Sequence, residues 1–381
     1  MNGSLPLGWI TDKLGNLVSF KTGKLNSNAA TPNGKYPFFT CSQETFKTDT
    51  YSFDTECVLL GGNNANGIYP LKYYSGKFDA YQRTYVIRSI NPNKLKIRYL
   101  YYALQLKLDL LRSISTGAAT KFLTLTILTD IGLEVPPPHI QDKIAAILSA
   151  YDDLIENNTR RIEILEEMAR SIYREWFVKF RFPGHEQVQM VDSELGLIPE
   201  GWEVKKLGEV IRFKNGKSIK VEEEGDYLVY GSNGIIGRTN EARYQNAIII
   251  GRVGAYCGSL IYSKSAFNAS DNTIIAESAS EKISIQLAFY VLEEMNLRHY
   301  AGGAAQPLLT QTVIKEIPAL VPDLKTNKKF QIIIANLIDF KSNLTNKIQN
   351  LRQTRDLLLP RLISGEIDVE NLDINTSQIA A

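Results

Sequence analysis

The chain contains the same sequence pattern twice. The stretch "LPLGWITDKLGNLVSFKTGK" begins at Leu5, and "IPEGWEVKKLGEVIRFKNGK" begins at Ile198, with ten identities in twenty positions. Four further pairs of segments follow in the same order, beginning with "KYPFFTCS" against "DYLVYGSN" and ending with "TGAATKFLTLTILTDI" against "GGAAQPLLTQTVIKEI". The separation between paired segments decreases slowly along the chain, which indicates one ancestral unit with small loop deletions, and two copies are too few for a solenoid. We therefore expect a duplicated unit of about 190 residues.

Each copy begins with short runs of apolar and β-branched residues that are separated by turns. The runs "ECVLLGG" and "RTYVIRS" correspond to "NAIIIGR" and "NTIIAES" in the second copy, and such runs are typical of β-strands. A helical segment follows in each copy. It leads to a short strand that ends at proline, "IGLEVPPP" or "IPALVP". The first part of each copy is therefore predicted to be a β-rich module.

The second part of each copy has the apolar spacing of a long helix. Seam residues recur in alternating steps of four and three from Ile144 to Trp176, and again in the second copy from Phe330 to Leu362. A repeat of 3.5 residues kept over about four heptads indicates a coiled coil. One such stripe would equally suit a core helix of a globular domain. Two stripes in register with a duplication favour a helix pair within the chain.

We expect this helix pair to be antiparallel, because each helix ends where the chain returns to a β-rich module. A helix of about 36 residues at ~1.5 Å per residue is roughly 55 Å long. Ala169, Lys341 and Arg355 complete the spacing, and Asn158 and Lys341 should fix the register at a cost in stability. The other predicted seam residues are Ile144, Leu148, Tyr151, Ile155, Ile162, Leu165, Ile172 and Trp176 in the first helix and Phe330, Ile334, Leu337, Leu344, Ile348, Leu351, Leu358 and Leu362 in the second.

These patterns predict an α+β fold in which two tandem-duplicated β-rich modules are separated by two long antiparallel coiled-coil helices. Trp9 and Trp202 occupy matching positions in the two copies, and we expect both to be core anchors. The expected boundaries are 1–138 for module 1, 139–181 for the first helix, 182–197 for a flexible linker, 198–323 for module 2, 324–365 for the second helix and 366–381 for a tail.

Composition excludes several classes of protein. The chain has 381 residues, 44% of them hydrophobic and 22% charged, as in soluble globular proteins. No apolar run approaches the roughly 18–20 residues of a membrane span, and the N-terminus lacks a basic-then-apolar signal, so we expect a cytoplasmic protein without a membrane segment. Three cysteines and three histidines are scattered along the chain, so we expect no disulfide framework and no metal site.

No complete catalytic motif is present. Gly216-Lys217-Ser218 resembles the end of a phosphate-binding loop, but Ile211 stands where that motif needs glycine. The glycine-rich stretches "GGNNANG" and "GRVGAYCG" do not open a helix in the dinucleotide-binding pattern, so they are either tight hairpins or loops that approach DNA. A methyl-donor loop and an Asn-Pro-Pro-aromatic tetrad are both missing.

One enzymatic alternative is a metal-dependent nuclease of the PD-DxK type. It would use Asp323, Asp339 and Lys341, whose spacing imitates that motif. The carboxylates of such a site must converge on Mg²⁺ from adjacent strands. Because Asp339 and Lys341 fall inside the predicted heptad helix, we expect the match to be accidental.

Two related modules on a stiff helix pair can contact two separated patches of one long ligand. DNA is the natural candidate, since two copies of one reader related by a pseudo-two-fold axis match its symmetry. The modules differ in sequence, so they are expected to read different half-sites.

The order of motifs resembles the specificity subunits of type I restriction–modification enzymes. The resemblance spans about Leu5 to Ile367, and it rests on "GW…KLG…FKxGK", then "TGAATKFLTLTILTDIGLEVPPPHIQDKIAAIL" and "IEILEEMARSIYREWFVKFRFPG", then the second "GW…KLG…FKxGK" and "LRQTRDLLLPRLISGEI". It implies two target recognition domains, each reading a few base pairs, in a subunit that is not catalytic. It also implies two docked modification subunits, which methylate adenine with S-adenosylmethionine, and restriction subunits, which use ATP and Mg²⁺. This chain is expected to bind no cofactor itself.

Charge differs between the two modules. Residues 1–138 contain fifteen Lys and Arg against nine Asp and Glu, whereas residues 198–322 contain thirteen against fourteen. A basic module suits a polyanionic partner, whereas module 2 must present a local basic patch if it binds DNA.

Polar residues in predicted loops are the candidates for DNA contact, because phosphates are bound by Lys, Arg and small polar groups and base edges by Arg, Asn, Gln and Asp. In module 1 these candidates are Lys21, Lys24, Asn63, Asn64, Asn66, Gln82, Arg83 and Lys121. In module 2 they are Lys214, Lys217, Ser232, Asn233, Arg238, Arg252, Asp271 and Asn272.

The helices leave apolar residues outside the seam, namely Ile147, Leu154 and Ile164. These residues either dock a modification subunit or pack against the chain's own modules. A different class of function also stays open, a free-standing scaffold whose two modules bind proteins or glycans.

Overall fold

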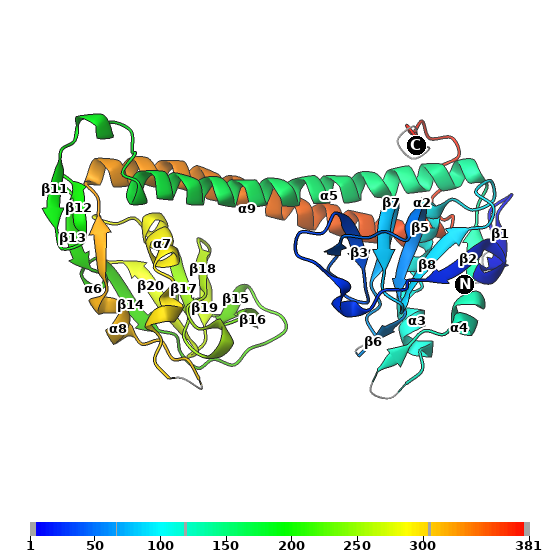
Figure 1. The fold of residues 1–381 in the computed structure, drawn as a ribbon, viewed down its shortest axis with the longest axis horizontal. Coiled ribbons are helices and arrows are strands. Elements are labelled where there is room, and N and C mark those ends of the chain that lie inside the picture. The colour runs from blue at the N-terminus through cyan, green and yellow to red at the C-terminus, as the bar shows by residue number, and fades with distance from the viewer. Residues whose placement is uncertain (1–4, 66, 118–119, 304–305, 377–381) are drawn as a thin grey trace. The chain divides into compact units, whose positions relative to one another are not determined.

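The computed structural model describes residues 5–65, 67–117, 120–303 and 306–376 (Figure 1). Contacts divide the chain into two compact units. Unit 1 consists of Met1–Asn158 and Asn346–Ala381, and unit 2 consists of Thr159–Thr345. Each unit contains one β-rich module and a part of both long helices.

Module 1 is built on a mixed six-stranded sheet. Only β3 and β7 are parallel, and the other neighbours are antiparallel. Three aliphatic residues from the sheet, Val58, Leu60 and Ile87, are fully buried against short helices on one face. The strand order is β2 (Val18–Thr22), β8 (Thr84–Ser89), β5 (Phe53–Gly61), β7 (Leu71–Ala80), β3 (Tyr36–Phe39) and β4 (Phe46–Thr48).

Module 2 repeats this order, but its sheet is divided. The strand that corresponds to β7 is interrupted after Ser263, and its two pieces belong to different sheets. One sheet has the order β14 (Ile211–Asn215), β20 (Thr273–Ser278), β17 (Ala247–Gly251) and β18 (Leu260–Ser263). The other has the order β16 (Gly234–Thr239), β15 (Tyr227–Gly231) and β19 (Phe267–Ala269).

The same backbone pairings recur in both modules at the positions that the repeat aligns. Phe38 faces Asp79 in the parallel β3–β7 pair, and the residues aligned with them, Val229 and Asn268, face each other in the parallel β15–β19 pair. The short helix α4 (Leu125–Thr129) is capped by the side chain of Thr124, and α8 (Gln311–Glu316) is capped by Thr310. The predicted duplication is confirmed.

Smaller elements complete each module in the same way. In module 1, β1 (Ile10–Lys13) pairs with β10 (Gly132–Val135), and in module 2, β13 (Glu203–Lys206) pairs with β21 (Pro318–Val321). The helical segments are α1 (Leu14–Leu17), α2 (Ile97–Gln105) and α3 (Leu108–Ile114) in module 1, and α6 (Leu207–Val210), α7 (Ile285–Glu294) and the 3₁₀ turn η5 (Leu297–Tyr300) in module 2.

Two long helices follow the modules, α5 (Pro138–Tyr173) and α9 (Leu324–Ile363). A π-helical turn, η2 (Arg174–Val178), extends α5 and turns Trp176 and Phe177 into the core of unit 2. All predicted seam positions are buried or half-buried. The helices are antiparallel within each unit. In unit 1, Asp152 bonds to Arg355, whereas the earlier residue Lys143 donates to the carbonyl of Val369, just after α9. In unit 2, Glu166 bonds to Lys341, whereas the later residue Trp176 contacts Phe330.

The polar seam residues have different environments. The Lys341 ammonium forms an ion pair with Glu166, and Arg355 Nη1 donates to Asp152 Oδ1 at 2.6 Å. Asp152 also accepts a hydrogen bond from the Tyr102 hydroxyl of α2 at 2.7 Å, so this carboxylate joins both long helices to module 1. The amide of Asn158 is buried, and its Nδ2 has no hydrogen-bond partner among the described residues.

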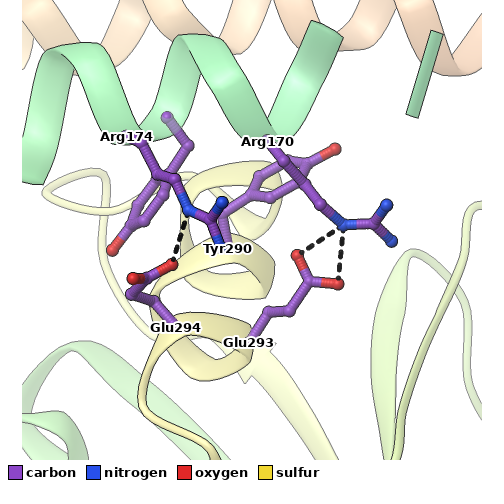
Figure 2. Close-up of a pocket in the computed structure, with 6 residues that line it drawn as sticks. Arg170, Arg174, Tyr290, Glu293 and Glu294 are labelled. Atoms are coloured by element: carbon purple, nitrogen blue, oxygen red, sulfur yellow. Dashed lines mark hydrogen bonds and ion pairs between the residues drawn. The ribbon is translucent and has the colours of Figure 1, made fainter. Parts of the chain in front are cut away.

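In unit 2, α5 and its extension η2 are joined to α7 by two neighbouring ion pairs. Figure 2 shows Arg170 bonded to Glu293 and Arg174 bonded to Glu294, with Nε–oxygen distances of 3.2 to 3.3 Å. A cavity of about 310 Å³ lies among these side chains and two tyrosines, one of which is Tyr290. Because its charged groups are already paired with one another, we interpret the cavity as part of the helix-to-module joint.

Two predicted segments are more ordered than expected. The linker predicted at 182–197 carries an antiparallel hairpin, β11 (Met190–Ser193) with β12 (Gly196–Pro199), and Phe182 is buried in the core of unit 2. The segment predicted as a linker therefore contains regular structure, because the hairpin supplies its own backbone hydrogen bonds and Phe182 stacks on Trp202. The predicted tail likewise contributes Val369 to the core of unit 1.

The matching tryptophans differ in burial. Trp202 is buried in the core of unit 2, and its indole nitrogen donates to Asp323 at 3.2 Å. Trp9 is only half-buried at the edge of the core of unit 1.

Across the described part of the chain, neither long helix nor any shorter one is apolar over a length that could cross a bilayer.

Candidate nucleic-acid interface

Several chain segments meet at one edge of each module, and we call this set of segments the loop cluster. In module 1 the loop cluster contains the end of β2 with Gly23 and Lys24, the end of β5 with Gly62, and the β7–β8 turn with Gln82 and Arg83. Three backbone hydrogen bonds hold these segments together. They run from Gly23 N to Thr84 O, from Gln82 N to Leu25 O and from Gly62 N to Arg83 O, at 3.3, 3.0 and 2.7 Å.

A β-hairpin completes the loop cluster of module 1. Thr116 and Phe122 exchange two backbone hydrogen bonds, and β9 (Lys121–Phe122) pairs with β6 (Asn63–Asn64). The Tyr85 hydroxyl donates to Leu123 O at 2.8 Å and anchors the hairpin to the sheet. Burial raises the pKa of Tyr85, so this hydroxyl keeps its proton for that bond.

Arg83 and Phe122 form a cation–π pair on this surface. The guanidinium carbon lies 5.7 Å from the centroid of the Phe122 ring, and both side chains are exposed. A guanidinium over an aromatic face keeps its N–H groups in its own plane, where they can donate to a ligand. Among the described residues, the Arg83 guanidinium has no ion pair and no hydrogen bond.

Two of these backbone bonds recur in the loop cluster of module 2, together with a third whose counterpart in module 1 runs from Leu123 N to Gly62 O at 2.9 Å. Gly216 N donates to Thr273 O, Arg252 N to Asn272 O and Leu309 N to Arg252 O, at 3.0, 2.9 and 2.9 Å. Gly302 and Leu308 exchange two backbone hydrogen bonds, as Thr116 and Phe122 do in module 1. The Ser232 hydroxyl donates to Asn272 O at 2.5 Å, which brings the β15–β16 turn into the cluster.

Most of the predicted contact residues therefore gather in two small areas. In module 1 these are Lys24, Asn63, Asn64, Gln82, Arg83 and Lys121, and in module 2 they are Lys217, Ser232, Asn233, Arg252, Asp271 and Asn272.

Three candidates lie elsewhere, and a fourth cannot be assigned a place. Lys21 is exposed on β2 opposite Val86, and its counterpart Lys214 is paired with Glu277 at 2.7 Å, so its charge is largely compensated. Arg238 lies on β16 and donates to Gly225 O at 2.8 Å, away from the β15–β16 turn. Asn66 lies outside the described residues.

Two exposed apolar residues at equivalent places, Phe122 and Leu308, also lie in these areas and are not among the predicted contact residues. The repeat between "TGAATKFLTLT" and "GGAAQPLLTQT" contained the available signal, because it aligned these two positions. Polarity alone predicts only the neighbouring Lys121. Both side chains can make the apolar contacts that base edges and thymine methyl groups offer.

The residues of the nuclease alternative serve other purposes. Asp323 accepts hydrogen bonds from Lys325 N, Thr326 N and Thr326 Oγ1 at the start of α9, which lowers its pKa. Asp339 is paired with Lys264 at 2.5 Å, and Lys341 with Glu166. All three are held at separate positions along α9 and its start, so their side chains do not form one site.

Two copies of one β-rich module, each with a polar and basic loop cluster, define a protein with duplicated recognition domains. The family model described as "Type I restriction modification DNA specificity domain" matches residues 6–167 and 199–352. The chain therefore belongs to the type I restriction–modification specificity subunits, and each match contains one recognition domain. The specificity subunit is the DNA-recognition component in this family and is not catalytic.

Known relatives agree in extent as well as in sequence. The chain is 27% identical to the type I restriction enzyme EcoDI specificity subunit of Escherichia coli, covering 100% of this chain and 94% of that protein. It is also 27% identical to the MjaIX specificity subunit of Methanocaldococcus jannaschii, covering 72% and 70%. The crystal structure of a type I S subunit from M. genitalium has the same fold, with a TM-score of 0.67, 19% identity and coverage of 95% and 97%.

Proposed function

We propose that this chain reads a bipartite, asymmetric DNA site, with one half-site bound by the loop cluster of each module. The observation that carries the proposal is the pair of loop clusters, which share most of their backbone hydrogen bonds but differ in their side chains. The same scaffold with different side chains can present the same approach to DNA and recognise different base pairs.

The chain supplies recognition, and its partners supply catalysis. Two modification subunits bring S-adenosylmethionine and methylate adenine, and restriction subunits bring ATP and Mg²⁺ when they join. The relatives support this assignment because they are named as specificity subunits of restriction enzymes. The chain itself holds no cofactor in this proposal.

Exposed apolar residues of the long helices dock the modification subunits. In unit 1 these are Leu154 of α5 and Leu357 of α9, which are 46% and 71% exposed. In unit 2 they are Ile164, Met168 and Ile332, with exposures between 47% and 63%. Ile147 packs against the core of unit 1 and is not part of this surface. Apolar side chains exposed in both units provide one docking surface for each modification subunit.

A binding experiment separates this proposal from the scaffold alternative. The purified chain, alone and mixed with its modification subunits, is tested by gel shift against a library of random duplexes. The expected result is selection of two short words at a fixed separation, and methylated adenines in the host genome should report the same words. Absence of sequence-selective binding in both mixtures would favour a scaffold. DNA cleavage by the chain alone that disappears in Asp339→Asn would favour the nuclease.

The docking surface is tested by charge substitution. Leu154→Glu should weaken one modification subunit's binding by at least tenfold, because a carboxylate is left buried against an apolar partner. Ile90→Glu, at a residue that is 59% exposed in module 1, is the matched control and should leave assembly unchanged. Size and mass measurements of the complex would contradict the proposal if both variants assembled equally well.

A further inference from the structure

In each loop cluster one arginine has a guanidinium without an ion pair or hydrogen bond among the described residues, and the two arginines lie on opposite sides of the same backbone hydrogen bond. In module 1 this bond joins Gly62 N to Arg83 O, and in module 2 it joins Arg252 N to Asn272 O. The arginine therefore lies in the β7–β8 turn of module 1, whereas in module 2 it directly follows β17. The residue across the bond is glycine in module 1 and asparagine in module 2.

Packing explains why the arginine follows the β5-equivalent strand in module 2 but not in module 1. A Cβ on Gly62 would lie 2.7 Å from Arg83 O and 2.9 Å from the Tyr85 ring, so no side chain fits there. The repeat that aligns Phe78 with Phe267 places the smaller Ile274 at the position of Tyr85, and Arg252 has room for its side chain. Three aligned pairs thus differ together, namely Gly62 and Arg252, Arg83 and Asn272, and Tyr85 and Ile274. Each module keeps one guanidinium beside the shared backbone hydrogen bond.

Each guanidinium group has one contact or enclosure that restricts its side chain. The Arg83 guanidinium lies over the Phe122 ring, and Arg252 is half-buried with its Nε enclosed and without a hydrogen-bond partner among the described residues. A buried donor without a partner is costly, which is consistent with a group that is satisfied by a ligand. The planar fork of an arginine matches the two acceptors on the major-groove edge of guanine, whereas a phosphate is bound equally well by the point charge of a lysine.

We infer that Arg83 and Arg252 are the guanine-reading side chains of module 1 and module 2. This inference rests on the proposed function and adds residues and a base to it. Each half-site contains a guanine whose recognition depends on one of these two arginines. Lys24 and Lys217, which are exposed and equivalent, make phosphate contacts beside them.

The experiment uses the chain in complex with its modification subunits and a library of random duplexes. Arg83→Ala and Arg83→Lys should each reduce the preference for guanine at one position of one half-site by roughly 5- to 150-fold. Arg252→Ala and Arg252→Lys should do the same in the other half-site only. The lysine variants keep the positive charge but lose the two parallel donors of the guanidinium. A loss of guanine preference in these variants therefore shows base recognition and not simple charge attraction.

Lys24→Ala and Lys217→Ala are the matched controls. They should weaken binding to all sequences alike and reduce its salt dependence, with the preferred words unchanged. Thermal unfolding, together with intact selection of the opposite half-site, shows that each arginine variant is folded.

A compensating variant tests the exchange of sides directly. Arg252→Gly should lose the guanine preference of its half-site, and adding Asn272→Arg should restore a preference for guanine there. The inference is overturned if the wild-type complex selects sequence and the arginine variants keep its preferences, if either half-site lacks guanine, or if one variant alters both half-sites. If the wild-type complex selects no sequence, the proposed function itself has failed.

Discussion

Single residues distinguish the two modules even where the backbone is the same. Asp79 and Asn268 are both fully buried at the equivalent point of the parallel strand pair. Asp79 accepts hydrogen bonds from the hydroxyls of Thr50 and Ser52, whereas Asn268 donates through Nδ2 to Glu241 O at 3.1 Å. The choice between carboxylate and amide follows from whether the surroundings offer donors or an acceptor.

This difference predicts an asymmetric effect of exchanging the two residue types. Asn268→Asp should destabilise the protein by about 2–4 kcal/mol at pH 7, because a buried carboxylate oxygen would face the Glu241 carbonyl. Asp79→Asn should cost less, since the two hydroxyls can rotate to accept from the amide. Urea unfolding of both variants measures the difference, and equal losses would contradict the explanation.

A second residue-scale prediction concerns Asp12, which is bonded to Lys94 at 2.8 Å and to Asn16 at 2.8 Å. The hydrogen bond from Lys94, followed by that from Asn16, lowers the pKa of Asp12 from 3.8 to about 2. A carboxyl whose folded pKa is lowered stabilises the fold above its unfolded pKa, and this contribution is lost as pH falls from about 4 to 2.

Lys94→Ala should therefore raise the pKa of Asp12 toward 3.8, as measured by NMR titration of the side-chain carboxyl carbon. Lys94→Arg is the control that keeps a positive donor, and it should leave the pKa low. A carboxyl that titrates at the same pH in Lys94→Ala and in the wild type would show that Lys94 is not the main cause.

At the scale of elements, periodicity predicted the helices and seam residues well because each depends on local sequence. The division of the β7 equivalent into β18 and β19 was not predicted, since "SKSA" at residues 263–266 resembles any exposed turn. The different positions of Arg83 and Arg252 relative to the shared backbone hydrogen bond could not be predicted from the sequence either. They depend on the Tyr85 ring above Gly62, and no spacing along the chain reveals that contact.

The seam residue Asn158 gives a prediction about the helix pair. Asn158→Leu should raise the free energy of unfolding by about 1–2 kcal/mol, because it removes a buried amide nitrogen that has no partner among the described residues. Asn157→Leu, at the exposed neighbouring position, should change it by no more than about 0.5 kcal/mol. A loss of stability in Asn158→Leu, measured by thermal and urea unfolding, would show that the amide is satisfied in solution.

At the scale of the whole chain, the units follow contacts and not the order of the two copies. Unit 2 is one continuous segment, Thr159–Thr345, which contains both the end of α5 and the beginning of α9. Unit 1 is discontinuous, because Leu359, Leu362, Ile363 and Val369 from the end of the chain are buried in the core of module 1. The duplication in sequence therefore assigns α9 to the second copy, while its last turns stabilise the first.

This arrangement predicts different behaviour of two fragments. Residues 159–345 should fold alone, with a cooperative thermal transition, because their core lies within one segment. Residues 1–158 lack the four buried aliphatic side chains, whose burial contributes roughly 6–12 kcal/mol, comparable with the whole stability of a domain. They should stay largely unfolded until a peptide of residues 346–381 is added. Circular dichroism and calorimetry measure both outcomes, and a fragment 1–158 that folds cooperatively without the peptide would contradict the assignment of the end of α9 to unit 1.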